Sequence, residues 1–320
     1  MRTSAISILM LAFSLTQTGF KAQAAAEDPP PTKEKSNIVD PAASKETLAQ
    51  AIAKMPRWTV LIEASAYRVG ASGKVRMPGS TALSSTLGQS SVTLEEIGAD
   101  SPRWAPYGRL RWRPAQGNWS FMASGFGTKL DVDGVVKQNQ RVGDMIQRPG
   151  DFIHTEIQFY NIDIEAGYRF FERARGIQKS SGATKLSPYV DLTAGLRVID
   201  TDVRFRHTSN LATPVIVPGQ RFEAENHDLF IHPIVGIRGG IELVEQFNVE
   251  LRTNVGGLPG TRRSITWDIE PCFTWRPHAN FGVHVGYRSL FMSVRSGGDN
   301  ERFSWRGSMA GLYFGVTGRF

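Results

Sequence analysis

The chain has 320 residues, 41% of them hydrophobic, and a formal net charge of +7 at pH 7. So small a basic excess does not indicate a nucleic-acid-binding protein, and a single cysteine, Cys272, excludes an intramolecular disulfide. The mean hydropathy is −0.24, and no segment beyond the N-terminal one is apolar enough for a spanning helix. A membrane protein with this sequence would therefore have to be a closed β-barrel.

The first 24 residues have the three parts of a secretory signal peptide. Met1 and Arg2 form a short positive region, residues 6–15 are apolar, and Ala22-Gln23-Ala24 is a small-residue cleavage region. The apolar part is shorter than the roughly 20 residues that span a bilayer as a helix. Residues 1–24 are therefore expected to be removed, and no cysteine lies at the cleavage point to carry a lipid anchor.

Residues 25–56 have the composition of a solvated linker. Three consecutive prolines at 29–31 are followed by charges at 33–35, and the apolar spacing over 48–55 predicts at most one or two turns of helix. This segment is expected in the periplasm.

From residue 57 to Phe320 the apolar residues alternate with the period of two that is typical of β-strands. The connections between strands are long after odd-numbered strands, the turn at 257–262 excepted, and mostly short after even-numbered ones. Outer-membrane barrels have long extracellular loops and short periplasmic turns. The pattern thus predicts an all-β, closed, antiparallel up-and-down transmembrane barrel over 57–320 with both termini in the periplasm. Its ten predicted strands are 57–69, 103–113, 118–130, 154–171, 187–204, 228–243, 246–256, 263–275, 279–292 and 308–320.

Two prolines complicate this strand count. Pro233 and Pro271 lie in the middle of predicted strands, where each removes a ladder hydrogen bond. Both are expected to mark bulges, and eight or twelve strands stay open as alternatives to ten.

Aromatic residues distinguish a lipid-facing barrel from a soluble sandwich. Trp104 and Trp112 lie eight residues apart, as do Trp267 and Trp275. Eight residues correspond to about 26 Å along a strand and, at a tilt near 40°, to about 20 Å across a membrane. These pairs are interpreted as two aromatic girdles on the outward face.

The opposite, inward face of the same strands carries nearly balanced charges. We interpret them as a network of paired acids and bases inside the barrel, because buried charges are found paired. The predicted members are Arg109, Arg111, Asp163, Glu165, Arg169, Asp191, Arg197, Arg238, Glu242, Glu250, Arg252, Asp268, Glu270 and Arg288.

Four strands repeat a glycine two residues before an inward arginine, for example in Ala166-Gly167-Tyr168-Arg169 and Val285-Gly286-Tyr287-Arg288. A glycine there leaves room for a long neighbouring side chain. This repeat resembles the Gly-Tyr-Arg strands of small outer-membrane barrels of the OmpA-like superfamily, which implies an architecture more than an activity.

The last strand alternates up to the C-terminal residue, with Phe314, Val316 and Phe320 on one face. It resembles the C-terminal signature strand of Gram-negative outer-membrane barrels, which the assembly machinery reads. The resemblance implies outer-membrane location, contacts with the barrel assembly machinery and periplasmic chaperones, and contacts with membrane lipid and lipopolysaccharide. No nucleic acid, cofactor or metal is expected, and the protein is expected to be a monomer.

Three functions fit this reading. The first is a structural barrel or a narrow pore for ions or small solutes, depending on whether the charge network fills the lumen. The second is surface interaction or adhesion through the long loop 70–102, whose weakly alternating part at 90–97 either extends a strand or forms an inward plug.

The third function is ester hydrolysis, which is not the preferred one. His207-Thr208-Ser209-Asn210 resembles the His-x-Ser-Asn segment of the lipid A 3-O-deacylases. That resemblance implies Ser209 as nucleophile, His207 as base and an acid such as Glu223 or Glu225 to orient the imidazole.

Overall fold

The computed structural model describes residues 60–79, 91–114, 118–137, 139–173, 175–179, 182–209, 219, 221–243, 246–278, 280–298 and 302–320, all within the compact unit Leu48–Phe320. The expected signal peptide at 1–24, the linker at 25–56 and the start of the first predicted strand at 57–59 lie outside the described residues. Within the described ranges, no helix is long and apolar enough to cross a membrane.

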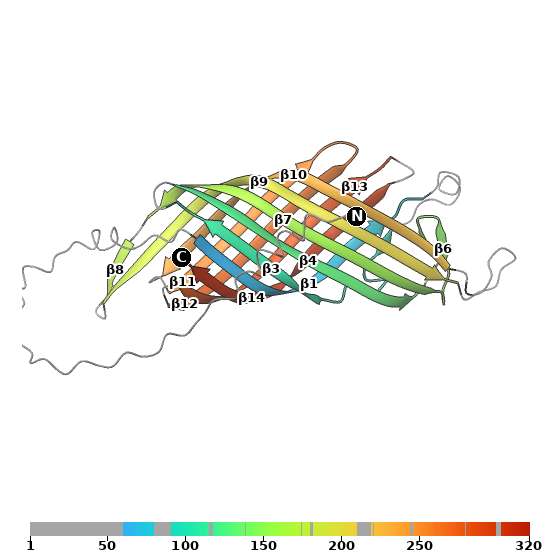
Figure 1. The fold of residues 1–320 in the computed structure, drawn as a ribbon, viewed down its shortest axis with the longest axis horizontal. Helices are drawn as coiled ribbons and strands as arrows, with labels where there is room; N and C mark the ends of the chain where they lie inside the picture. Colours follow the sequence, from blue (N-terminus) through green and yellow to red (C-terminus); the bar gives the residue numbers. More distant parts are fainter. Residues whose placement is uncertain are drawn as a thin grey trace, which may run out of the picture. The chain divides into compact units, whose positions relative to one another are not determined.

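Ten long antiparallel strands pair in chain order and close into a barrel, because β1 pairs with β14 and β9 pairs with β10. Figure 1 shows these strands running obliquely side by side. They are β1 (Val60–Arg76), β3 (Arg103–Trp112), β4 (Trp119–Val135), β7 (Phe152–Glu172), β9 (Gly182–Thr208), β10 (Arg221–Leu243), β11 (Phe247–Leu258), β12 (Arg263–His278), β13 (Phe281–Ser296) and β14 (Phe303–Arg319).

Short strands lie at both ends of the barrel. At the end with the long loops, β2 (Val92–Thr93) pairs with β1, and β5 (Gln140–Val142) forms a hairpin with β6 (Met145–Gln147). At the other end, β8 (Arg175–Lys179) forms a hairpin with the first residues of β9. The sequence analysis placed no strand at 172–186, so the β8–β9 hairpin differs from that expectation.

The structure confirms the predicted fold class and the ten strands. The bulges expected at the two prolines are wrong. The β9–β10 register passes Pro233 opposite Leu196 without a shift, and the β11–β12 register likewise passes Pro271 opposite Leu251. Each proline is paired on one side only. On the other side, β10–β11 pairing begins just after Pro233, at Ile234, and β12–β13 pairing is interrupted at residues 270 and 271.

The last residue closes the barrel. The backbone N–H of Phe320 donates to the carbonyl of Val60, and the N–H of Val60 donates to the carbonyl of Phe320, both at 2.9 Å. The first and last strands therefore meet at the end of the barrel that carries the short turns, as the predicted phase of the connections required.

In the half of the barrel nearest the short turns, the polarity of a soluble protein is reversed. Outward apolar side chains are strongly exposed, with Trp104 at 61% and Ile164 at 58%, and the inward side chains of Asp163, Arg197 and Arg288 are completely buried. Trp112, Trp267 and Trp275 also point outward and are exposed. Such an exterior is compatible with lipid and not with water.

In the other half the polarity is that of a soluble protein. On β9 the inward Ile199, Val203 and Phe205 are buried. The outward residues that alternate with them, at 200, 202, 204 and 206, are all charged. A charged exterior over an apolar interior belongs in water. The strands therefore continue beyond the lipid-facing band, which explains why β1, β4, β9 and β13 run further at this end than predicted.

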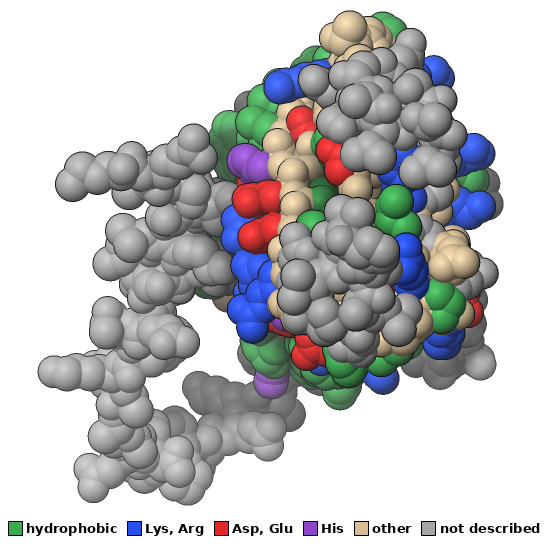
Figure 2. All heavy atoms as spheres, turned by 90° about the vertical axis from the view of Figure 1, so that its right-hand side faces the viewer, with side chains coloured by type: hydrophobic (Ala, Val, Ile, Leu, Met, Phe, Trp, Pro, Cys, Tyr) green, Lys and Arg blue, Asp and Glu red, His purple; other side chains and the backbone are tan. Residues whose placement is uncertain are grey.

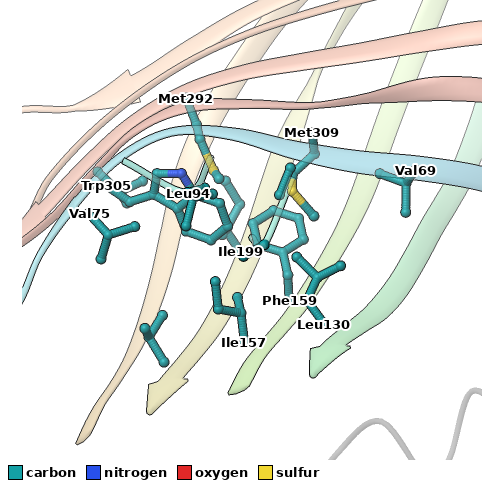
Figure 3. Packing of buried hydrophobic residues seen from close by; sticks show 14 of the residues in the cluster. Val69, Val75, Leu94, Leu130, Ile157, Phe159, Ile199, Met292, Trp305 and Met309 are labelled. Atoms are coloured by element: carbon teal, nitrogen blue, oxygen red, sulfur yellow. The ribbon is translucent and has the colours of Figure 1, made fainter. Parts of the chain in front are cut away.

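Apolar side chains fill the interior of this extension (Figure 3). Trp305, Phe159 and Leu94 are among its fully buried members. Leu94, Ile97 and Ala99 come from the segment after β2 and not from the barrel wall. Both outcomes considered for residues 90–97 thus occur in part, because Val92 and Thr93 pair with β1 as a short strand and Leu94 and Ile97 pack inward, whereas 80–90 lie outside the described residues.

Candidate functional site

The inward charges meet in the middle of the lipid-facing half. Arg197 holds Asp163 with both ends of its guanidinium, from Nε to Oδ1 at 2.6 Å and from Nη2 to Oδ2 at 2.9 Å. Arg252 and Arg288 each donate to the same Oδ2 at 2.8 Å. Asp268 accepts from Arg288 at 2.6 Å and from Arg197 at 2.8 Å. Because these residues come from β7, β9, β11, β12 and β13, the cluster crosses the lumen.

Glu270 is the centre of a neighbouring group. Its carboxylate accepts hydrogen bonds from the hydroxyls of Tyr107 at 2.7 Å and Tyr313 at 2.8 Å, and from Arg252 at 3.1 Å. Arg109 also donates to it. The shared Arg252 joins this group to the Asp163 cluster.

Glu250 forms a third group, closer to the short turns. Arg111 donates to both of its oxygens, at 2.7 and 3.0 Å, and the hydroxyl of Tyr189 donates at 2.6 Å. Arg109 reaches Glu250 at 3.4 Å and so connects it to the Glu270 group.

The network ends at Asp191 and Glu242. Arg169 donates to Asp191 at 2.7 Å and Arg238 at 2.5 Å. Arg276 lies 3.6 Å from Glu242. The lipid-facing half thus contains ion pairs along its length, and shared arginines link the Asp163, Glu270 and Glu250 groups.

An aromatic layer separates the charges from the apolar interior. The guanidinium of Arg288 lies 5.2 Å from the ring centroid of Phe126 and 5.5 Å from that of Tyr107. Tyr67 packs edge-on against Phe126 at 5.1 Å, and Tyr107 against Tyr313 at the same distance. Tyr107 and Tyr313 therefore present their rings to the apolar side and their hydroxyls to Glu270, whereas the hydroxyl of Tyr67 donates to the backbone carbonyl of Arg288.

All residues predicted for the charge network lie on the inward face. Arg169 and Glu242 are only partly buried. The sequence interpretation missed Glu63, whose carboxylate lies 3.2 Å from Arg109, and the hydroxyl of Tyr189. Glu63 was detectable, because the period of two places it on the same face as the inward Leu61 and Tyr67.

The glycines of the repeat make room for neighbours. A Cβ at Gly286 would lie 2.4 Å from the ring of Tyr313, and one at Gly167 would lie 2.8 Å from Ser120 Oγ and 3.4 Å from Arg238 Nη2. At these two glycines the space left by the missing side chain is occupied by a side chain from another strand, whereas at Gly195 the backbone of β7 lies in that space.

The residues considered for hydrolysis lie at the loop end. Nε2 of His207 is 2.8 Å from Oδ2 of Asp151, and both side chains are buried. Glu223 instead points outward and pairs with Arg206 at 3.2 Å. The acid that the resemblance implied is thus replaced by Asp151, which sequence spacing did not indicate. Ser209 is also buried.

Glu225 likewise forms an ion pair away from His207, with Arg204 at 2.9 Å. Asp133, near the loop end of β4, lies 2.8 Å from Nδ1 of His154. Over the part of the chain that the structure describes, no group of three or more His, Cys, Asp or Glu residues is placed to hold a metal ion.

A closed antiparallel sheet with an apolar outer belt, outward aromatic residues and a buried charged interior is the architecture of an outer-membrane β-barrel protein. The assignment rests on the strand pairing and the reversed polarity. No family model matches the chain, and no curated protein matches it.

Several solved outer-membrane proteins resemble it weakly. The outer membrane protease OmpT from Escherichia coli is 10% identical with a TM-score of 0.41, over 83% of this chain and 98% of that chain. Neisserial surface protein A is 12% identical with a TM-score of 0.30, over 82% and 97%. Ail, the attachment invasion locus protein of Yersinia pestis, is 11% identical with a TM-score of 0.28, over 82% and 96%.

Proposed function

We propose that the protein is a sealed outer-membrane barrel with a structural role, which raises a rigid, water-exposed extension above the lipid. The observation that carries this proposal is the filling of the interior by two successive layers. A layer of interlocked charges lies within the lipid-facing half, and an apolar layer lies above it. Ten strands enclose little more space than the eight that side chains alone can fill.

The pairing within the charge layer favours a structural role over transport of ions. Asp163, Asp268 and Glu270 each accept hydrogen bonds from at least two arginines. Groups so fully paired exchange partners with a passing ion only at the cost of leaving a buried charge uncompensated. The layer above is mostly apolar, with Ile157, Phe159 and Trp305 fully buried in it, and its buried carboxylate Asp228 accepts a hydrogen bond from Ser296.

Conductance of the purified barrel in planar bilayers tests this proposal. A sealed barrel produces no current steps above the leak at any salt concentration. Stable steps that scale with salt would instead identify a narrow pore, the alternative that the charged lumen also suggested.

The location and orientation follow from the same proposal. We infer export by a signal peptide at 1–24, assembly by the barrel machinery through Phe314, Val316 and Phe320, and placement of both ends of the barrel sequence in the periplasm. Outward exposure of all three side chains supports this role. Protease digestion of intact cells, with tags inserted at 259–262 and at 244–246, tests the orientation: only the first should be cleaved.

A surface-interaction role is the second candidate, and the extension favours it. Only part of loop 70–102 is a candidate for this role. Residues 72–76 belong to β1, and residues 94–97 belong to the apolar interior. Deleting 72–98 would therefore damage the barrel, whereas deleting 80–90 leaves these contacts in place and is the appropriate test for lost binding.

Ester hydrolysis keeps one supporting contact, the bond between His207 and Asp151. Burial of His207 and Ser209 weighs against access of a lipid substrate. Acyl release from lipopolysaccharide by the purified protein, lost in Ser209→Ala, would establish this activity in place of the structural role.

A further inference from the structure

The outer surface of the extension is hollowed at its upper edge, where β4 and β9 end and β7 and β10 begin. Strand register places two rows of outward residues there. The upper row is Val135, Phe152, Thr208 and Arg221, and the lower row is Asp133, His154, Arg206 and Glu223. All of these residues except Val135 line a hollow of about 700 Å³, a volume typical of sites for small ligands.

The formal charges of the hollow cancel one another. Its two acids are matched by two arginines, Arg206 and Arg221. Nδ1 of His154 lies 2.8 Å from Asp133, and Arg206 donates to Glu223 at 3.2 Å. Acidic, basic and histidine surfaces likewise adjoin along one side of the rim in the view onto the loop end (Figure 2). A site without net charge favours a neutral ligand over an ionic one.

The paired side chains of the lower row keep hydrogen-bonding capacity. The side chain of Asp133 is mostly exposed, and those of Arg206 and Glu223 are about half exposed. A carboxylate accepts about four hydrogen bonds and a guanidinium donates up to about five, so one pairing leaves most of them unused. The pairing also orients the remaining donors and acceptors. Groups oriented in this way suit a ligand hydroxyl, which donates to a carboxylate and accepts from a guanidinium at the same time.

Phe152 adds an aromatic surface beside these polar groups. Its side chain is 54% exposed, with Val135 opposite it on β4 and Thr208 opposite it on β9. Covering an exposed aromatic ring with a ligand is favourable, because it removes apolar surface from water. The hollow thus offers an apolar contact and a polar border to the same small ligand.

Lipid does not reach this ring. On β7 the outward residues 162, 164 and 166 are apolar and 154, 156 and 158 are polar, so Tyr160 marks the edge of the lipid-facing band. Phe152 lies eight residues beyond Tyr160, which corresponds to about 26 Å along the strand and to about 20 Å along the membrane normal at a tilt near 40°. The polar layer of a bilayer adds only about 5–8 Å beyond the hydrocarbon on each side.

The apolar patch is too small for the core of a protein interface. A standard interface buries about 800 Å² on each partner around an apolar centre. Phe152 and Val135 are the two apolar side chains of the upper row, and the outward positions below them are polar on all four strands. These positions are 129, 131 and 133 on β4, 154, 156 and 158 on β7, 202, 204 and 206 on β9, and 223, 225 and 227 on β10. Two apolar side chains match one small ring instead.

We propose that this hollow binds a neutral saccharide, with one face of a pyranose ring stacked on Phe152 and the hydroxyls of the ring bonded to the lower row. The C–H bonds of such a ring form an apolar face and its hydroxyls radiate from the edge, which matches an aromatic ring bordered by polar groups. Because the hollow lies above the headgroups, the saccharide is the end of a glycan on another surface. The inference rests on the orientation proposed above, with the loop end outside the cell, but not on the sealed lumen.

Saturation-transfer NMR on the purified mature protein tests the proposal, in a detergent without sugar headgroups. The probes are three neutral disaccharides (lactose, cellobiose and chitobiose) and one charged probe, sulfated lactose. Saturation of the aromatic protons of the protein should pass to the C–H protons on one face of a neutral sugar, because only that face contacts Phe152. Sulfated lactose should bind no better than lactose, since the hollow has no net charge.

Substitutions separate stacking from general apolar contact. Phe152→Ala and Phe152→Leu should each weaken the affinity for the neutral sugar by about tenfold or more, since stacking of a flat ligand ring on an aromatic side chain contributes about that much. Phe152→Trp should keep the affinity. The matched control is Val135→Ala, because Val135 lies opposite Phe152 and is 49% exposed, and it should change the affinity by less than about threefold. Glu223→Ala should weaken the affinity by about tenfold through loss of a charged hydrogen-bond acceptor.

Absence of transfer to all three neutral sugars would overturn the proposal, as would retained affinity in Phe152→Ala or Phe152→Leu. An equal loss in Val135→Ala would reject stacking, and tighter binding of sulfated lactose would reject a neutral ligand. If the Phe152 variants do not fold, the wild-type spectrum decides, because transfer to both faces of the sugar ring contradicts stacking. Binding by the purified protein but not by intact cells would refute the proposed orientation alone.

Discussion

Asp163 shows how the barrel makes a buried charge stable. Its carboxylate lies inside the lipid-facing half with no exposed surface, but three arginines donate to it. The cost of removing an ion from water is offset only when such donors surround it. Each arginine also depends on its acids, so the side chains of the cluster are stable together and not singly.

Asp163→Asn should therefore destabilise the barrel by about 3–5 kcal/mol, because it leaves arginine charge buried without its partner. Asp133→Asn, at the outward pair with His154, is the control and should cost less than about 1 kcal/mol. Equilibrium urea unfolding in lipid vesicles, followed by tryptophan fluorescence, measures both. Equal losses would show that the arginines of the cluster reach water.

At the scale of the strand, polarity exchanges faces partway along β7 and β9. Sequence periodicity predicted both strands and their inward charges, because alternation is the same on either side of the exchange. It placed the loop-side ends of β1, β4, β9 and β13 too early, and it did not show that outward charges within a predicted strand, such as Asp200 and Asp202, lie beyond the lipid-facing band. In the structure these charges lie on a strand in water, above an apolar interior.

This exchange predicts a depth-dependent tolerance of charge on β7. Ile164→Arg, in the lipid-facing band, should cost about 2–4 kcal/mol. Gln158→Arg lies six residues away on the same outward face, above the band, and should cost less than about 1 kcal/mol. Unfolding in vesicles measures the two, and a similar cost at both positions would contradict the proposed membrane boundary.

The last strand predicts that its terminal aromatic side chain matters for assembly in cells but not for the stability of the folded barrel. Phe320 is 69% exposed, and its closing contacts with Val60 are made by backbone atoms. Phe320→Ala should therefore reduce the folded fraction in the outer membrane of cells, while the unfolding free energy of the refolded protein changes by less than about 1 kcal/mol.

Phe291→Ala provides the comparison for this variant. Phe291 is also outward and exposed, but it lies in mid-barrel and should leave assembly in cells unchanged. Normal assembly of the Phe320→Ala protein would show that the terminal aromatic residue is not read as a signal.

At the scale of the whole molecule, sequence reasoning identified the wall but not the contents of the barrel. The alternation shows which side chains point inward, and the network residues were found in this way. It does not show which partners meet across the lumen, because Asp163 and Arg288 are brought together only by closure. The pairing of His207 with Asp151 depends instead on the register of the neighbouring strands β7 and β9, which places His207 opposite Ile153 and which sequence spacing does not give.

The two layers across the lumen should seal it independently. Contacts between Tyr67 and Phe126, Phe126 and Phe159, and Phe159 and Trp305 carry the apolar layer from wall to wall, with centroid distances of 5.1 to 5.7 Å. The charge layer crosses the same lumen below it. Opening one layer therefore leaves the other in place.

Three variants test this arrangement in planar bilayers. Arg252→Ser with Asp268→Ser removes one acid and one base from the charge layer, and Trp305→Ala with Phe159→Ala opens the apolar layer. Neither pair alone should produce current steps, whereas all four substitutions together should, because only then does an open path join the two ends. Heat-modifiable migration shows that each barrel is closed.

Steps from the charge-layer variant alone would mean that the apolar layer does not seal the lumen. No steps from the quadruple variant would mean that neighbouring side chains collapse into the space. The first result would contradict independent sealing by two layers. The second would show that the barrel is closed by its whole interior, because ten strands leave the lumen too narrow for four truncations to open it.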